Sequence, residues 1–117
     1  MDVEEIQNIC NSFPMTEAEM KWRSDLVFMI GRKMFCMVDL QPAPPVVSFK
    51  VPDEDYETLS NEPGFKPAPW FGKNKWVAVT DNNVLGRRDW QRYLRQSYDL
   101  VVMKLSLKSK KELGLAH

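Results

Sequence analysis

Two apolar runs separated by a short turn constrain the fold of this chain most. The runs are Leu26–Ile30 and Met34–Leu40, and Gly31-Arg32-Lys33 lies between them. Glycine tolerates the positive φ that a tight hairpin turn needs, so this pattern predicts two antiparallel strands. Both runs place large apolar side chains on both faces of the strand. Such strands either lie centrally in a sheet with both faces covered, or leave one face to meet a partner.

Further elements are expected on either side of this hairpin. Asp2 followed by Glu5 is typical of a capped helix start, and apolar residues recur at helical spacing near both ends of the chain. Asp53 is expected to cap a short helix in the middle of the chain. The expected helices cover residues 3–12, 54–60 and about 87–104, and the expected strands cover residues 26–30, 34–40, 46–50 and 76–80, with an additional edge strand near 64–68.

This order of elements predicts an α+β fold. Neighbouring strands joined by tight turns imply an antiparallel sheet. Helices from the N- and C-terminal parts of the chain are expected to pack on one face of it, which gives a two-layer sandwich. A length of 117 residues fits a single domain over residues 1–117, with a basic C-terminal tail at 106–117.

Composition and the start of the chain indicate a cytoplasmic protein. No apolar run reaches the roughly 18 residues that a membrane-spanning helix needs, so no membrane contact is expected. The N-terminal MDVEEIQNIC lacks the basic start of a signal peptide. Cys10 and Cys36 lie in apolar surroundings, where small buried thiols are expected and a disulfide is the alternative.

The chain offers little chemistry for an active site. Its only histidine is His117, which excludes Ser-His-Asp and Cys-His arrangements within the chain. It has neither zinc-ligand spacing nor a glycine loop that would cradle phosphate. The acidic run from Asp53 to Glu57 could hold a hard cation, but the helix dipole alone favours carboxylates at a helix start. We therefore expect no enzymatic activity, no metal and no cofactor.

The charged residues are distributed unevenly, although the net charge is zero. Residues 1–62 carry twelve acidic and five basic side chains, a net −7, and residues 63–117 carry four acidic and eleven basic, a net +7. The basic half can be a footprint for phosphate, or it can be the complement of the acidic half folded against it. The candidate nucleic-acid-binding residues are Arg88, Arg92 and Arg95 on one helix face, Lys66, Trp70, Lys73 and Lys75 in a proline-rich segment, and Arg32 and Lys33 at the hairpin tip.

Each of these three groups also has a structural interpretation. A line of arginines can be the solvated face of a helix. The tryptophans of the segment can be packing residues with solvent-exposed lysines between them. A charged hairpin tip favours solubility without any ligand. The functional alternatives are a phosphate-contacting stripe, a basic loop whose aromatic rings stack on bases, and a wing inserted into a groove.

Four segments together resemble the MmcQ/YjbR family. They are KWRSDLVFMIGRKMFCMVDL, VSFK before PDEDYETL, PAPWFGKNKWVAV and QSYDLVVMKL. The resemblance covers about residues 3–113, and its most specific parts are Lys33–Phe35, Pro67–Trp76 and Ser97–Val101. It implies a CyaY-like α+β fold, and members are commonly described as small bacterial DNA-binding proteins with a double-wing motif. Many members carry histidines around the second tryptophan, and their absence from residues 70–76 weakens a family-wide catalytic role there.

The leading expectation is therefore a non-enzymatic protein that binds DNA weakly and without much sequence preference. One alternative is a homodimer or a complex with a protein partner. It would use an apolar sheet face with Phe35 and Met37, or their opposite-face neighbours, as anchors. The other alternative is a small-molecule site lined by Trp22, Trp70 and Trp76.

Overall fold

The structure is a computed structural model that describes residues 2–69 and 74–115. A six-stranded antiparallel sheet with the strand order β1-β2-β3-β4-β6-β5 forms its centre. The elements are α1 (Val3–Asn11), β1 (Glu17–Lys21), β2 (Asp25–Ile30), β3 (Lys33–Asp39), β4 (Val46–Lys50), α2 (Asp53–Ser60), β5 (Phe65–Pro67), β6 (Trp76–Val79), the 3₁₀ helix η2 (Asn82–Val84), α3 (Arg87–Met103) and α4 (Leu107–Glu112).

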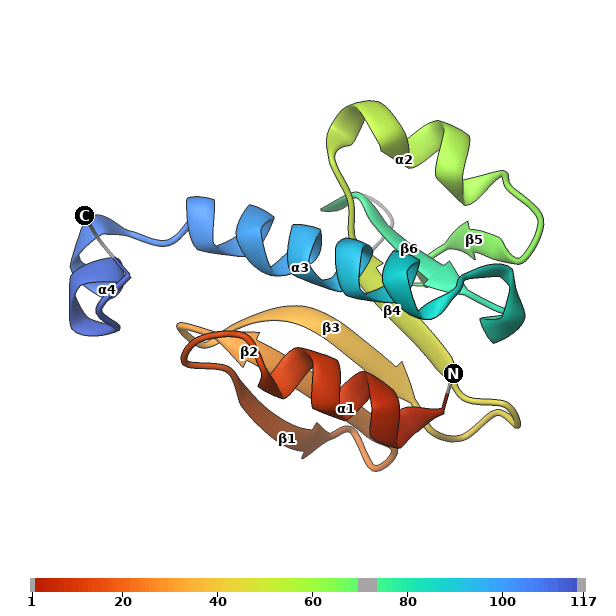
Figure 1. Ribbon diagram of the computed structural model, residues 1–117, viewed down its shortest axis with the longest axis horizontal. Helices are drawn as coiled ribbons and strands as arrows, with labels where there is room; N and C mark the ends of the chain where they lie inside the picture. Colours follow the sequence, from red (N-terminus) through yellow and green to blue (C-terminus); the bar gives the residue numbers. More distant parts are fainter. Residues whose placement is uncertain (1, 70–73, 116–117) are drawn as a thin grey trace.

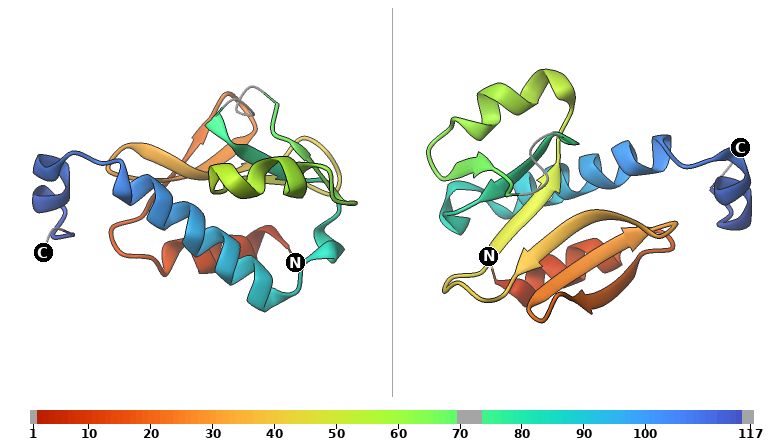
Figure 2. Two further views of the ribbon diagram at one scale, coloured as in Figure 1. Left: turned by 90° about the horizontal axis from the view of Figure 1, so that it is seen from above. Right: turned by 180° about the vertical axis from the view of Figure 1, so that it is seen from behind.

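The helices α1 and α3 lie side by side on one face of the sheet (Figure 1). Seen from behind, the opposite sheet face lies in front of both helices (Figure 2). The short α2 packs beside β5 and β6 at one side of the sheet. The predicted α+β sandwich, with an antiparallel sheet and the N- and C-terminal helices on one face, is confirmed.

The main core fills the space between the sheet and its helices. Alternate residues of β2, such as Phe28 and Ile30, point to this side and are completely buried. They meet Trp90 and Leu94 of α3, which are also completely buried, and Ile6 of α1. Burial of such large side chains contributes roughly 1.5–3 kcal/mol each, so this layer is the main source of stability.

The β2–β3 hairpin is tighter than expected. Ile30 pairs with Lys33, so Lys33 belongs to β3 and the turn consists of Gly31 and Arg32 alone. Both turn residues have positive φ, at 58° and 66°, which two-residue hairpin turns with the right strand twist require. A Cβ at Gly31 would also lie 3.0 Å from the side chain of Leu105, which follows α3.

The structure corrects two details of the sequence prediction and adds one strand. Asp53 is the first residue of α2 rather than its cap; the cap is Pro52, and no side chain caps this helix. The edge strand β1 was not expected, although Glu17–Lys21 alternates polar and apolar residues, because the alternation is short and Ala18 and Met20 are its only apolar residues. A β-bulge between β2 and β3 adds one residue to β3, so that both Phe35 and Cys36 are buried in the main core.

Candidate nucleic-acid interface

A pocket lined by lysines lies where four elements meet. The start of β3, the ends of β4 and α3, and the start of β6 border an open depression with a volume of about 300 Å³. We call it the lysine pocket, and its lining residues are Lys33, Met34, Lys50, Asn74, Trp76, Val101 and Lys104. None of these described lining residues is acidic, so the pocket is a concentration of positive charge in a protein without net charge.

The fold determines the position of each lysine in this pocket. Lys50 lies opposite Trp76 in the pairing of β4 with β6, and its backbone N–H donates a hydrogen bond to Ser97 Oγ (2.9 Å). Lys33 starts β3 directly after the hairpin turn. Lys104 follows the last turn of α3, where the helix dipole favours a positive charge.

The positive charges in this region are close enough to repel one another. Burial lowers the pKa of Lys50, and the nearby Lys104 and Lys75 lower it further, while Asp53 opposes the shift. The Lys50 ammonium donates one hydrogen bond, to the backbone carbonyl oxygen of Asn74 (2.6 Å). Lys75 Nζ lies 5.1 Å from the centroid of the Tyr56 ring. An anion in the pocket would therefore be attracted by several ammonium groups at once.

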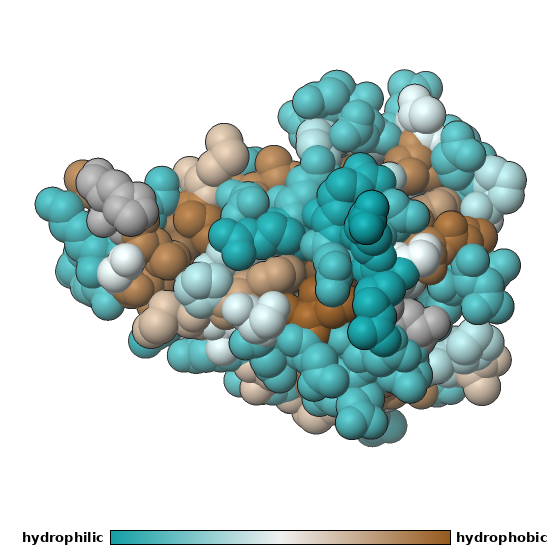
Figure 3. All heavy atoms as spheres, in the orientation of Figure 1, coloured by the Kyte–Doolittle hydropathy of each residue, from teal (hydrophilic) through white to brown (hydrophobic). Residues whose placement is uncertain are grey.

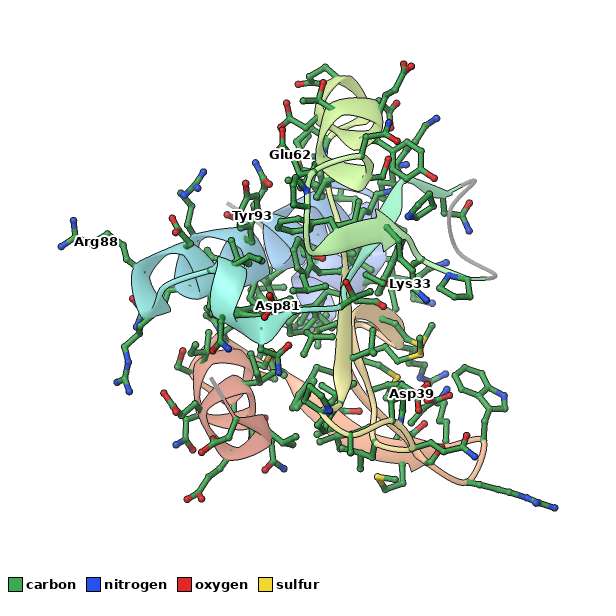
Figure 4. All side chains as sticks on the ribbon, turned by 90° about the vertical axis from the view of Figure 1, so that its right-hand side faces the viewer. Lys33, Asp39, Glu62, Asp81, Arg88 and Tyr93 are labelled. Atoms are coloured by element: carbon green, nitrogen blue, oxygen red, sulfur yellow. The ribbon has the colours of Figure 1, made fainter. Side chains whose placement is uncertain are left out.

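The predicted arginine stripe has a different environment. Arg92 pairs with Asp89 (3.3 Å), and Arg95 pairs with Asp99 (3.1 Å), both on α3 itself. Arg88 is exposed. Figure 4 shows Arg88 and Lys33 on opposite sides of the view, so the stripe and the lysine pocket form separate surfaces. The acids within α3 offset part of the positive charge of the stripe, although exposed pairs of this kind are worth only about 0–1 kcal/mol.

The face that carries this stripe is the outer surface of the helix layer. Figure 3 shows it as mostly hydrophilic, with a hydrophobic patch near its middle. A groove of about 560 Å³ between α1 and α3 has Ile9 and Phe13 among its lining residues, with Arg87 and Arg95 from α3. Arg87 is paired with Glu5 of α1 (2.7 Å). Acidic partners on both helices thus accompany the basic residues of this face.

The remaining predicted residues are spread over the molecule. Lys66 is exposed on the edge strand β5, and Arg32 is exposed at the β2–β3 turn. Arg32 lines a separate pocket whose other residues include Glu17 and Glu112. Trp70 and Lys73 lie outside the described residues.

Sequence reasoning placed Lys33 and Lys75 in different groups and missed Lys50 and Lys104. The fold brings Lys33, Lys50 and Lys104 to one pocket, and Lys75 lies close enough to Lys50 to lower its pKa, after the larger effect of burial. The sequence evidence that Lys50 and Lys104 belong to a site was weak, because Lys50 ends a predicted strand and Lys104 ends a predicted helix. A lysine at the end of an element is common and does not by itself indicate a site.

Two of the three tryptophans considered for a small-molecule site are far apart in the structure. Trp22 lies in the β1–β2 turn and is 60% exposed, whereas Trp76 in β6 is 5% exposed. In the sheet order, β3 and β4 separate β2 from β6. The structure therefore separates Trp22 from Trp76, and Trp70 lies outside the described residues.

No described helix covers the second face of the sheet (Figure 2). A small apolar cluster lies there, in which Met34, Met37 and Val46 are partly buried around Trp76 and its neighbours. Of the two proposed anchor residues, Met37 belongs to this face. Phe35 is completely buried in the main core and is therefore not accessible to a partner.

None of the described helices has the length and apolar character needed to cross a membrane. Among the described residues, no group of three or more histidine, cysteine, aspartate or glutamate side chains could hold a metal ion together.

Comparisons with known proteins place this arrangement in a family. No curated protein matches the sequence. A Deinococcus radiodurans protein with a DUF419 domain is similar in structure, with a TM-score of 0.87, 28% identity, and coverage of 97% of this chain and 88% of that one. A Pseudomonas syringae protein shares the fold at a TM-score of 0.73 and 22% identity, covering 86% of this chain and 98% of that one. The family model YjbR matches residues 11–100. The chain belongs to the YjbR family.

Proposed function

We propose that this protein is a non-enzymatic, cytoplasmic DNA-binding protein that contacts phosphates through the lysine pocket and its surroundings. The observation that supports this most is the convergence of Lys33, Lys50 and Lys104 from three different elements without an acidic residue in the described lining. Binding is weak and has little sequence preference, because lysines contact the uniform phosphate backbone rather than base edges.

The distribution of charge supports an oriented approach of DNA despite a net charge of zero. Acidic residues gather at the β1 side of the sheet, where Glu17 and Glu19 are exposed and Asp25 lies opposite Asp39. Lys50 and Lys104 lie at the ends of β4 and α3, away from this edge, whereas Lys33 starts β3 beside β2 and Asp53 of α2 lies near Lys50. DNA would be repelled from the acidic edge and attracted to the lysine end, which favours one orientation of the complex.

Binding of a fluorescent DNA duplex tests this proposal. Fluorescence anisotropy compares the wild type with a Lys33→Gln/Lys104→Gln double variant, in which both changed side chains are exposed and their loss should leave the fold intact. Weaker binding by the variant is expected. Equal affinity for the two proteins would contradict a role for the lysine pocket.

A protein contact through the second sheet face is the alternative function. It is favoured by the partly buried Met34, Met37 and Val46, which lie on a face without a described helix. Soluble monomers rarely expose large apolar patches, so such a face is a natural place for a second copy or another protein. Light scattering at micromolar concentration distinguishes a self-associating protein from a monomer.

A further inference from the structure

We infer that the lysine pocket binds a phosphate monoester, either the terminal 5′-phosphate of a nucleic acid or the phosphate of a free nucleotide. The inference deepens the proposed function. Binding of a terminal 5′-phosphate rests on that function, because the ligand is then part of a nucleic acid. The second source does not require binding to DNA. The arguments concern the shape of the pocket, its charge and the positioning of its donors.

The shape of the pocket favours a small group over a segment of duplex. Its volume of about 300 Å³ is at the lower end of the range for small-molecule sites. It is a shallow depression open to solvent, bordered by Met34 from β3, Trp76 from β6 and Val101 from α3. The internal phosphates of a duplex lie along a continuous backbone, whereas a terminal phosphate can enter a recess.

The charge of the pocket favours a monoester over a diester. A phosphate monoester carries about 1.5 to 2 negative charges at neutral pH, because its second pKa is near 6. An internal phosphate in nucleic acid is a diester with a single charge. The ammonium groups of Lys33, Lys50 and Lys104 together line the pocket, so the more highly charged anion gains more from them. Burial lowers the pKa of Lys50 most, Lys104 and Lys75 lower it further and Asp53 opposes them, which agrees with a cluster that an anion would stabilise.

The central donor of the pocket is already held in place. The backbone N–H of Lys50 is fixed by Ser97, and one N–H of its ammonium is bonded to the Asn74 carbonyl oxygen. An ammonium has three N–H donors, so Lys50 keeps two for a ligand. Lys33 and Lys104 are exposed and can turn toward the same anion. Trp76, Met34 and Val101 supply an apolar wall beside the charged groups, suited to the sugar or base that carries the phosphate.

Matched oligonucleotides test the first source of ligand. Two single-stranded octamers of the same sequence, labelled at the 3′ end, differ only in a 5′-phosphate or a 5′-hydroxyl. We expect about tenfold tighter binding of the phosphorylated strand, since one additional charge-assisted contact is gained. This preference should disappear in Lys104→Gln. It should persist in Arg88→Gln, which removes an exposed charge at the far surface.

Adenosine monophosphate and adenosine test the second source. Titration followed by two-dimensional NMR should show shifts of the Lys50, Asn74 and Lys104 amide signals with the nucleotide and not with the nucleoside. Lys104→Gln should weaken the nucleotide response, and Arg88→Gln should not. A nucleotide response without any preference for the phosphorylated strand would identify the free nucleotide as the ligand.

The outcomes separate this inference from the proposed function. Equal binding of the two octamers together with no pocket-specific response to the nucleotide would overturn the monoester site. Duplex binding that Lys33→Gln/Lys104→Gln weakens would still support the DNA-binding proposal in that case. A nucleotide response lost in Lys104→Gln, without binding to any oligonucleotide, would support the monoester site and overturn the DNA-binding proposal. A nucleotide response that Lys104→Gln and Lys33→Gln both leave unchanged would also overturn the site.

Discussion

The hydroxyl of Ser97 on α3 donates a hydrogen bond to the carbonyl oxygen of Phe35 on β3, at 2.5 Å. The same hydroxyl accepts the backbone N–H of Lys50, so one buried side chain joins α3 to two neighbouring strands. The ring of Tyr98 packs edge-on against Phe35 at 5.4 Å between centroids. Phe35 meets Ser97 and Tyr98 in the core, and these residues belong to the segments 33–35 and 97–101, which are among the most specific parts of the family resemblance. These contacts fix the packing of α3 on the sheet and the position of Lys50.

Removing the Ser97 hydroxyl should destabilise the fold. Ser97→Ala leaves the Phe35 carbonyl and the Lys50 N–H without this partner in a fully buried place, which costs about 2 kcal/mol. Urea unfolding followed by circular dichroism measures the loss. Ser12→Ala is the control, because this exposed hydroxyl bonds only to the Ile9 carbonyl oxygen and should matter much less. Equal effects of the two variants would contradict a bridging role for Ser97.

The pair of Asp25 and Asp39 should make stability depend on pH. Burial, followed by the neighbouring charge of Asp39, raises the pKa of Asp25. The folded state therefore binds this proton more tightly than the unfolded state, and the resulting stability is lost as pH rises through the folded pKa. Asp25→Asn should be more stable than the wild type at pH 7, and the difference should vanish toward pH 3, below the usual range of the carboxyl.

Thermal unfolding of the wild type and Asp25→Asn across this pH range checks the sign. Glu17→Gln serves as the control, since this glutamate is exposed on the edge strand β1. A variant that is less stable than the wild type at pH 7 would show that the Asp25 carboxylate is stabilising in the folded protein.

The two cysteines should be unreactive in the folded protein. Cys10 and Cys36 are free and buried, as the sequence predicted. Burial raises the pKa of Cys36 well above its ordinary value, and a hydrogen bond with Cys10 raises it further. Since the thiolate is the reactive form, a thiol reagent such as Ellman's reagent should detect no cysteine until the chain is unfolded. Rapid reaction of either thiol in native protein would contradict this packing.

If the second sheet face forms a contact between copies, Met37 is the residue to change. Met37→Glu places a charge in the apolar cluster of that face and should convert an associated protein into a monomer. Met103→Glu is the control, because Met103 is 71% exposed at the end of α3. Light scattering gives the mass of each protein. A wild type that is strictly monomeric and binds no apolar dye would remove the main support for this contact.

Strong local patterns explain why most of the fold could be predicted. The apolar hairpin and the long periodic helix specify their own conformations, and their ends agree with the structure to within a residue or two. The edge strand β1 is harder to predict, because the polar-apolar alternation of Glu17–Lys21 is only five residues long and includes just two apolar side chains, Ala18 and Met20. In the structure this strand pairs with β2.

The candidate site was harder to predict, since it depends on contacts between distant segments. Lys50 and Lys104 are 54 positions apart, and only the packing of α3 on the sheet brings them to one pocket. The helical wheel grouped Arg92 and Arg95 correctly. It did not take into account Asp89, three positions before Arg92, or Asp99, four positions after Arg95. In the structure each of these acids pairs with its arginine. Those spacings are visible in the sequence and are typical of pairs on one helix.

The salt dependence of duplex binding tests the central claim most directly. The measurement is made on the wild type and on two double variants, Lys33→Gln/Lys104→Gln and Arg88→Gln/Arg95→Gln. Both variants change the net charge by the same amount. Each phosphate contact contributes about 0.9 to the slope of log affinity against log salt, so the lysine variant should lose about two units of slope. The arginine variant should lose less. Equal affinities and equal slopes for all three proteins would contradict phosphate binding by the lysine pocket.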